Sequence, residues 1–151
     1  MYHCYGGSHS SVVAAAVHVG LLAPHPCPSR QVLMSLPYFD TQKSADHGIL
    51  QFVGTDQAGN VVCSVGLQTA ADTVIKALAN LMAIAGAGGR EIVFIDTLPA
   101  VNLWMKIGGI CSRVFGLKAI GRPLVVFGVK RAFPSLVSLV NRALMAEQKE
   151  V

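Results

Sequence analysis

Short apolar runs alternate along the chain with longer stretches of three-and-four apolar spacing, a pattern that predicts an α/β protein. A strand is expected at Met1–Tyr5, followed by a helix at Ser10–Leu22. Two β-rich runs, His47–Thr55 and Asn60–Leu67, flank a short polar segment with a glycine, which predicts an antiparallel hairpin at a sheet edge. The spacing of Thr69–Ile84 predicts a second long helix, ended by a glycine-rich segment.

Two unbroken apolar runs, Glu91–Asp96 and Leu124–Val129, are typical of parallel strands buried on both faces. Between them, Pro99 is expected to open a helix that Gly108 and Gly109 break or kink before Cys111–Leu117. These elements would place two further strands in the sheet.

Prolines and polar residues mark the remaining boundaries. Pro24–Pro28 predicts an extended connector, and Ser29 is expected to cap a short helix at Arg30–Leu36. The segment Pro37–Asp46 has little periodicity, which is typical of a lid over a site. Pro134 is expected in the first turn of a final amphipathic helix.

These elements predict one domain over residues 1–151, an α/β/α three-layer sandwich. Its sheet is expected to be mostly parallel, with about five strands and an antiparallel edge hairpin. The chain is 52% hydrophobic and only 13% charged. Large surfaces must therefore be buried, either by helices on both faces of the sheet or by pairing of subunits in a homo-oligomer.

Composition also predicts the compartment. The apolar run Val12–Ala23 is interrupted by His18 and followed by Pro24, so it is too short to span a membrane, and no positively charged leader precedes it. The four cysteines show no C-x-x-C pairing, which favours reduced thiols. A cytoplasmic protein that does not enter the membrane is expected.

The net charge of +4 is uneven along the chain. Residues 106–151 contain eight Lys/Arg and two Glu, a balance of +6, whereas the preceding part has four Lys/Arg and six Asp/Glu, a balance of −2. The basic residues are separated and not interleaved with stacking aromatic residues. This favours a solvated basic face and argues against a nucleic-acid partner.

The opening of the chain contains the most informative motif. Tyr2-His3-Cys4-Tyr5-Gly6-Gly7-Ser8-His9-Ser10-Ser11 leads from the first strand directly into the apolar helix Val12–Val17. The first N–H groups of a helix have no intrahelical acceptor and carry a partial positive charge, and glycines let the preceding backbone curl around an anion. The predicted anion-binding residues are Gly6, Gly7, Ser8, His9, Ser10 and Ser11, and the expected ligand is a phosphate-bearing small molecule.

Two known loop types can be compared with this segment. A nucleotide-binding P-loop, G-x-x-x-x-G-K-[ST], would place His9 at the lysine and Ser10 at the hydroxyl, but three of its four fixed positions fail. His3-Cys4, five residues and Ser10-Ser11 resemble the H-C-x5-R-[ST] loop of small cysteine-dependent phosphatases, with Ser10 in place of the arginine. The same segment resembles the phosphocysteine loop of sugar phosphotransferase B subunits.

These resemblances imply phosphoryl chemistry on a thiolate. Cys4 would be the nucleophile, Ser10 would assist it, and His9 would donate to the anion. A helix amino end stabilises both a thiolate and the transferred charge. Absence of the arginine removes the bidentate clamp of a phosphatase. The alternative is that Cys4 is a buried strand thiol, that His9 faces water and that the serines only cap the helix.

Five supporting residues are predicted around the loop. Asp96, Lys130 and Arg131 follow predicted strands, whose carboxyl ends form the expected ligand edge of the sheet. His3 precedes Cys4, and His47 with Asp46 could supply acid–base chemistry or be turn residues. His18 is expected to pack in the apolar face of the first helix. No pair of His or Cys has strong zinc-ligand spacing, so no metal site is predicted, and the cofactor is left undetermined.

The whole chain, and its opening residues Tyr2–Ser11 above all, resembles a domain-of-unknown-function family of anaerobic, spore-forming bacteria. This resemblance implies no reaction. Three functions therefore stay open: a phospho-ligand-binding domain with phosphoryl transfer or phosphoester hydrolysis, a non-catalytic binding, regulatory or oligomerising domain, and a degenerate nucleotide-binding P-loop protein.

Overall fold

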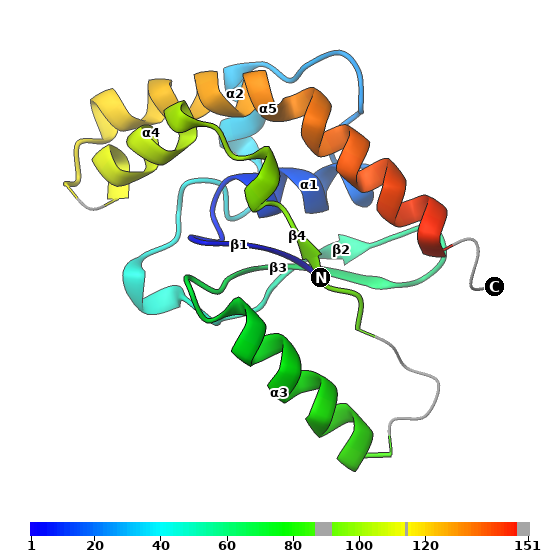
Figure 1. The fold of residues 1–151 in the computed structure, drawn as a ribbon. Helices are drawn as coiled ribbons and strands as arrows, with labels where there is room; N and C mark the ends of the chain where they lie inside the picture. Colours follow the sequence, from blue (N-terminus) through cyan, green and yellow to red (C-terminus); the bar gives the residue numbers. More distant parts are fainter. Residues whose placement is uncertain (87–91, 114, 148–151) are drawn as a thin grey trace.

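The computed structural model describes residues 1–86, 92–113 and 115–147, and contains a four-stranded mixed sheet (Figure 1). The strand order is β2-β3-β1-β4. β1 pairs in parallel with both β3 and β4, and β2 pairs antiparallel with β3. The strands are β1 (Tyr2–Cys4), β2 (Gln51–Thr55), β3 (Val61–Gly66) and β4 (Ile95–Asp96).

The helices lie unevenly about this sheet. α1 and α5 lie on one side of it, with α2 and α4 beyond, whereas α3 lies on the opposite side (Figure 1). The helices are α1 (Ser10–His18), α2 (Arg30–Ser35), α3 (Ala71–Ile84), α4 (Leu103–Arg113) and α5 (Lys118–Glu147), and the 3₁₀ turns are η1 (Ser44–Asp46) and η2 (Leu98–Ala100).

The core is built around α1. Every residue of its Val12–Ala16 segment is at most 1% exposed, so this helix is apolar on all sides. α5 covers it with a stripe at helical spacing that includes Val125, Val129, Leu136 and Val140. Burial of these small side chains supplies the main stabilising free energy of the fold. α1 is thereby held rigidly beneath the loop that precedes it.

Several sequence predictions are confirmed. The chain is mixed α/β, it begins with a strand and a helix, and the hairpin is antiparallel with β2 at the sheet edge. Ser29 caps α2, because its hydroxyl accepts a hydrogen bond from the N–H of Val32 at 3.3 Å. α3 ends at Ile84, and the glycine-rich segment that follows it falls partly outside the described residues.

The prediction of a buried strand at Leu124–Val129 is wrong, because these residues lie inside α5. Pro134 is likewise in the interior of α5 and not in its first turn. A short apolar run cannot be assigned to strand or helix by periodicity alone. Here the buried positions continue at three-and-four spacing from Gly121 to Val140, so packing against α1 and α4 determines the helix.

The expected helix break at Gly108 and Gly109 is also wrong, since both residues lie within α4. The structure gives a packing role to Gly108 instead. A Cβ atom at Gly108 would lie 2.6 Å from the backbone nitrogen of Val125, and one at Gly121 would lie 2.4 Å from that of Ser112. Glycine therefore allows the backbones of α4 and α5 to touch.

The strand predicted at Glu91–Asp96 is reduced to Ile95–Asp96, at the sheet edge and not buried on both faces, while Glu91 lies outside the described residues. The described residues form four strands, not five. The three-layer sandwich is not confirmed, because α3 has no buried residue and does not close the second face of the sheet.

α5 changes the expectation about membranes. Within the described residues, this helix is long and apolar enough to cross a bilayer by length and composition, which the sequence pattern did not indicate. Half of its apolar window is buried against the rest of the fold, as in the core helix of a soluble protein. On these grounds α5 is weak evidence for a membrane span.

Candidate anion-binding loop

The loop Gly6–Ser11 connects β1 to α1 and is shaped by two glycines. Gly7 has a φ of +65°, a conformation that other residues adopt with strain. A Cβ atom at Gly7 would lie 2.4 Å from the nitrogen of Gly66, and one at Gly66 would lie 2.7 Å from the carbonyl carbon of Gly6. The end of β3 therefore contacts the loop backbone to backbone, which sets the curl of the loop.

The sulfur of Cys4 lies at the start of this curl and has two polar contacts. The N–H of Gly7 donates to Sγ at 3.1 Å, and the Ser11 hydroxyl lies 3.2 Å from it. Cys4 is 6% exposed, which leaves only a small part of the residue accessible. N–H and O–H donors directed at sulfur stabilise a thiolate, which is the reactive form. This environment suits a nucleophile.

Ser10, in contrast, is tied to a different element. Its hydroxyl lies 2.9 Å from the hydroxyl of Thr97, which donates to the carbonyl oxygen of His3 at 2.9 Å. Thr97 is fully buried and directly follows β4. The hydroxyl that contacts Cys4 thus belongs to Ser11, whereas Ser10 anchors the start of α1 to the neighbouring strand.

His9 belongs to a buried polar cluster beside the loop. Its Nε2 lies 3.1 Å from one carboxylate oxygen of Asp40, and the other oxygen accepts a hydrogen bond from Nε of Arg122 at 2.9 Å. The hydroxyl of Ser112 lies 3.2 Å from both oxygens and donates to the carboxylate. The N–H of Asp40 donates to the carbonyl oxygen of Ser8, which joins the cluster to the loop backbone. A guanidinium is thereby connected to the loop through Asp40.

Asp40 is held as a carboxylate. Burial by itself raises the pKa of this group, but the hydrogen bonds from His9 and Arg122, the charge of His9 and the Ser112 hydroxyl outweigh burial and lower the pKa to about 2. The Asp40 side chain is 1% exposed and its φ is +53°, which is unusual for a residue other than glycine. Strain of this kind is often found at functional sites.

N–H groups without an acceptor among the described residues are present at the start of α1 and in the loop before it, as predicted, but most of them are buried. Within residues 1–86, 92–113 and 115–147, the N–H groups of Gly6, Ser10 and Ser11 have no hydrogen-bond acceptor. Ser10 and Ser11 are nevertheless fully buried, whereas Gly6 and His9 are partly exposed. A ligand must therefore approach the Cys4 sulfur past Gly6 and His9. Two hollows in the described part of the chain lie away from the loop, one between β4 and α5 and the other between η2 and α5.

The other predicted site residues divide into two groups. His3 and Asp96 are neighbours across β1 and β4, with Nδ1 and a carboxylate oxygen 3.9 Å apart, and the His47 ring lies against Tyr5, next to Cys4. Lys130 and Arg131 follow no strand, because α5 replaces the predicted one, and Arg131 lies over the ring of Phe127. His3, Asp96 and His47 thus lie near the loop, whereas Lys130 and Arg131 lie within α5 and do not follow a strand.

Four residues of the site environment were missed from the sequence: Asp40, Thr97, Ser112 and Arg122. Asp40 lies within the irregular segment Pro37–Asp46 that is expected to be a lid, and Arg122 belongs to the basic C-terminal third, so each had a weak signal. Thr97 and Ser112 had none, because their partners are 87 and 72 positions away.

A family model described as "Protein of unknown function (DUF3189)" matches residues 1–144. The chain belongs to this family. The match covers the whole of the β1-loop-α1 unit, all of α4 and α5 as far as residue 144, so the site described above is part of the DUF3189 domain. No curated protein and no solved structure matches the chain.

Proposed function

We propose that this DUF3189 protein binds a phosphate monoester at Gly6–Ser11 and transfers its phosphoryl group to the sulfur of Cys4. The observation that supports this function most strongly is the pair of polar contacts to sulfur: the N–H of Gly7 donates to it at 3.1 Å, and the hydroxyl of Ser11 lies 3.2 Å from it. A thiolate at Cys4 would accept hydrogen bonds from both groups, which would stabilise the nucleophilic form.

The reaction balances with the groups near the loop. The Cys4 thiolate attacks phosphorus, an S–P bond forms, the P–O bond to the alcohol breaks, and the alcohol oxygen takes a proton from His9. Water then attacks phosphorus, the S–P bond breaks, the thiolate is restored, and the proton returns to His9. The N–H of Gly6, which is partly exposed and has no acceptor among the described residues, stabilises the phosphoryl oxygens. A reduced thiol is required, which suits a cytoplasmic protein.

Asp40 and Arg122 have supporting roles in this scheme. Asp40 orients His9 and maintains it as a proton carrier, as carboxylates do for catalytic histidines. Arg122, whose side chain is 35% exposed, adds positive charge next to the loop that the arginine missing at position 10 would otherwise supply. Its hydrogen bond to Asp40 makes it a positioning residue.

The test uses p-nitrophenyl phosphate with the wild type, Cys4→Ser and Cys27→Ser. Acid-quenched protein is mapped by peptide mass spectrometry, and release of p-nitrophenol is followed in parallel. We expect a phosphoryl group on the Cys4 peptide of the wild type and of Cys27→Ser, whose Cys27 is exposed and remote from the loop. An unmodified Cys4 peptide together with no release of p-nitrophenol contradicts the proposed reaction.

A second candidate function is self-association through the outer face of α4. Leu103, Ile107 and Ile110 recur at helical spacing and are 66%, 40% and 50% exposed. An apolar stripe of this kind on a chain that is 52% hydrophobic indicates an interface. Sedimentation velocity of the wild type and Ile107→Lys tests it: we expect an oligomer that the substitution dissociates, and a monomeric wild type contradicts it.

A further inference from the structure

Three metal-ligating side chains from distant parts of the chain meet at the end of the sheet opposite the Cys4 loop. His18 ends α1, Asp56 begins the β2–β3 turn, and Glu147 lies in the last turn of α5. One ligand atom of each lies within 4.8 Å of the other two. Nε2 of His18 is 3.2 Å from a carboxylate oxygen of Asp56 and 3.9 Å from one of Glu147.

The imidazole of His18 is oriented from behind. Nδ1 of His18 lies 2.7 Å from the hydroxyl of Tyr2, a fully buried residue of β1, and the two rings meet edge to face. A hydrogen bond on one ring nitrogen that directs the other nitrogen toward a ligand is the arrangement seen around metal-binding histidines. Nε2 is thereby aimed at the two carboxylates.

Asp56 is also held in place before any ligand binds. One of its oxygens accepts from the N–H groups of Ala58 and Asn60, and the other accepts from the Asn60 side chain at 3.0 Å. The side chains of His18 and Asp56 are only 3% and 4% exposed, and that of Glu147 is 27% exposed. A buried carboxylate such as that of Asp56 needs a countercharge. A single N–H at Nε2 can donate well to one carboxylate but not to two.

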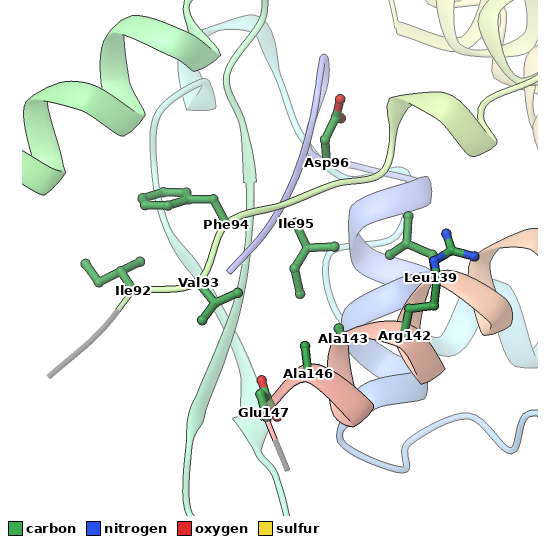
Figure 2. A pocket seen from close by; sticks show the side chains of 10 residues that line it. All are labelled: Ile92, Val93, Phe94, Ile95, Asp96, Leu139, Arg142, Ala143, Ala146 and Glu147. Carbon is green, nitrogen blue, oxygen red and sulfur yellow. The ribbon is translucent and has the colours of Figure 1, made fainter. Parts of the chain in front are cut away.

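We propose that His18, Asp56 and Glu147 bind one divalent transition-metal ion of the Zn²⁺ type. One imidazole nitrogen and two carboxylate oxygens favour such an ion over Ca²⁺ or Mg²⁺, which prefer ligand sets made of oxygen alone. Three protein ligands leave a further position for water. Glu147 lines a hollow of about 490 Å³ between β4 and α5, through which water can reach it. Figure 2 shows its side chain among the residues that line this hollow.

The ion would have a structural role. α1 separates its first residue, Ser10, from His18 by about 12 Å, so the metal does not reach Cys4. It ties the C-terminal end of α5 to α1 and to the β-hairpin, three elements that are otherwise joined by side-chain packing. Ligands at positions 18, 56 and 147 are too far apart in the chain to form a local sequence motif, which explains why the site could not be predicted from the sequence.

The experiment uses tag-free full-length protein, stripped of metal with EDTA and kept reduced. Binding of Zn²⁺ is measured by equilibrium dialysis and thermal unfolding is followed by circular dichroism. We expect one Zn²⁺ per chain and an increase in Tm. Glu147→Gln is expected to weaken the affinity for Zn²⁺ tenfold or more and to abolish the increase in Tm, with an unchanged circular dichroism spectrum, because Glu147 is at the end of α5.

Asp72→Asn is the matched control, because it also removes one carboxylate and lies on the exposed side of α3. It is expected to bind Zn²⁺ as the wild type does. Binding of no Zn²⁺ by the wild type overturns the proposed site, and so does equal binding by Glu147→Gln and the wild type, which would place the ion elsewhere, for example on cysteines. Glu147→Gln should react with p-nitrophenyl phosphate like the wild type, so the two proposals fail separately.

Discussion

The sulfur of Cys4 and the hydroxyl oxygen of Ser11 lie 3.2 Å apart, on opposite sides of the loop that joins β1 to α1. Ser11 is in the first turn of α1 and is fully buried, so its hydroxyl has a defined direction. This contact links the candidate nucleophile to the first turn of the helix that follows the proposed phosphate-binding loop.

Ser11→Ala should therefore slow alkylation of Cys4 by iodoacetamide at neutral pH. A hydrogen bond to a charged group stabilises it by about 1.5–3 kcal/mol, so loss of the Ser11 hydroxyl should slow the reaction at sulfur about tenfold or more. Peptide mass spectrometry separates Cys4 from the other three cysteines. Ser10→Ala is the control, because the Ser10 hydroxyl contacts Thr97 instead. Equal rates in both variants would show that the Ser11 hydroxyl does not act on the sulfur.

Gly66→Ala should distort the loop although residue 66 is far from it in sequence. The added Cβ atom would lie 2.7–2.9 Å from backbone atoms of Gly6 and Gly7, which cannot move aside as a side chain can. Such overpacking costs about 1–3 kcal/mol of unfolding free energy, and phosphate binding should be lost.

Gly6→Ala is the matched substitution, because a Cβ atom there meets nothing within 4 Å and Gly6 does not have a positive φ. Chemical denaturation of both variants gives the comparison. Tolerance of Gly66→Ala, or an equal loss of stability in Gly6→Ala, would mean that the loop is not shaped by its contact with β3.

Asp40→Asn should lower stability in a pH-dependent way. The pKa of Asp40 is about 2 in the folded chain, below its ordinary value of 3.8, so its stabilising contribution is complete above about pH 4 and is lost as the pH falls toward 2. At pH 7 we expect a loss of about 1.5–3 kcal/mol. Urea unfolding at several pH values should show the gap between wild type and variant closing below pH 4. A gap that stays constant would contradict the charged state of Asp40.

His3 should make the protein less stable in mild acid. Burial lowers the pKa of His3 below 6.5, against the opposing charges of Asp96 and Asp72, and the Met1 amino group lowers it further. The unfolded chain therefore binds more protons than the folded one just below pH 6.5, and stability falls as the pH decreases through that range. His3→Gln should remove this dependence. An identical pH profile of unfolding for wild type and variant would show that His3 takes up its proton equally in both states.

The elements before residue 67 could largely be predicted because their sequence signals are local. β1, the loop glycines, α1 and the Ser29 cap follow from adjacent residues, and the hairpin follows from its turn chemistry. The region after Leu98 could not, because Leu124–Val129 has the composition of a strand but is held as a helix by packing against α1 and α4. Gly108 was expected to break or kink its helix, yet Gly108 and Gly121 are required for close contact of two helices.

The same division holds for the site. Cys4 and its loop were visible in the sequence because they are contiguous. Asp40, Thr97 and Arg122 reach the loop only through the tertiary fold, so neither spacing nor composition could assign them. Ser10 and Ser11 are adjacent and chemically identical, and only the geometry of the helix start shows which of them contacts sulfur.

The most direct test of the anion-binding loop is the alkylation rate of Cys4 measured against increasing inorganic phosphate at constant ionic strength. A phosphate held at the loop by the partly exposed N–H of Gly6 would block the sulfur, so the rate should fall along a saturable curve, while the rate at the exposed Cys27 stays constant. A Cys4 rate that is independent of phosphate would contradict the account.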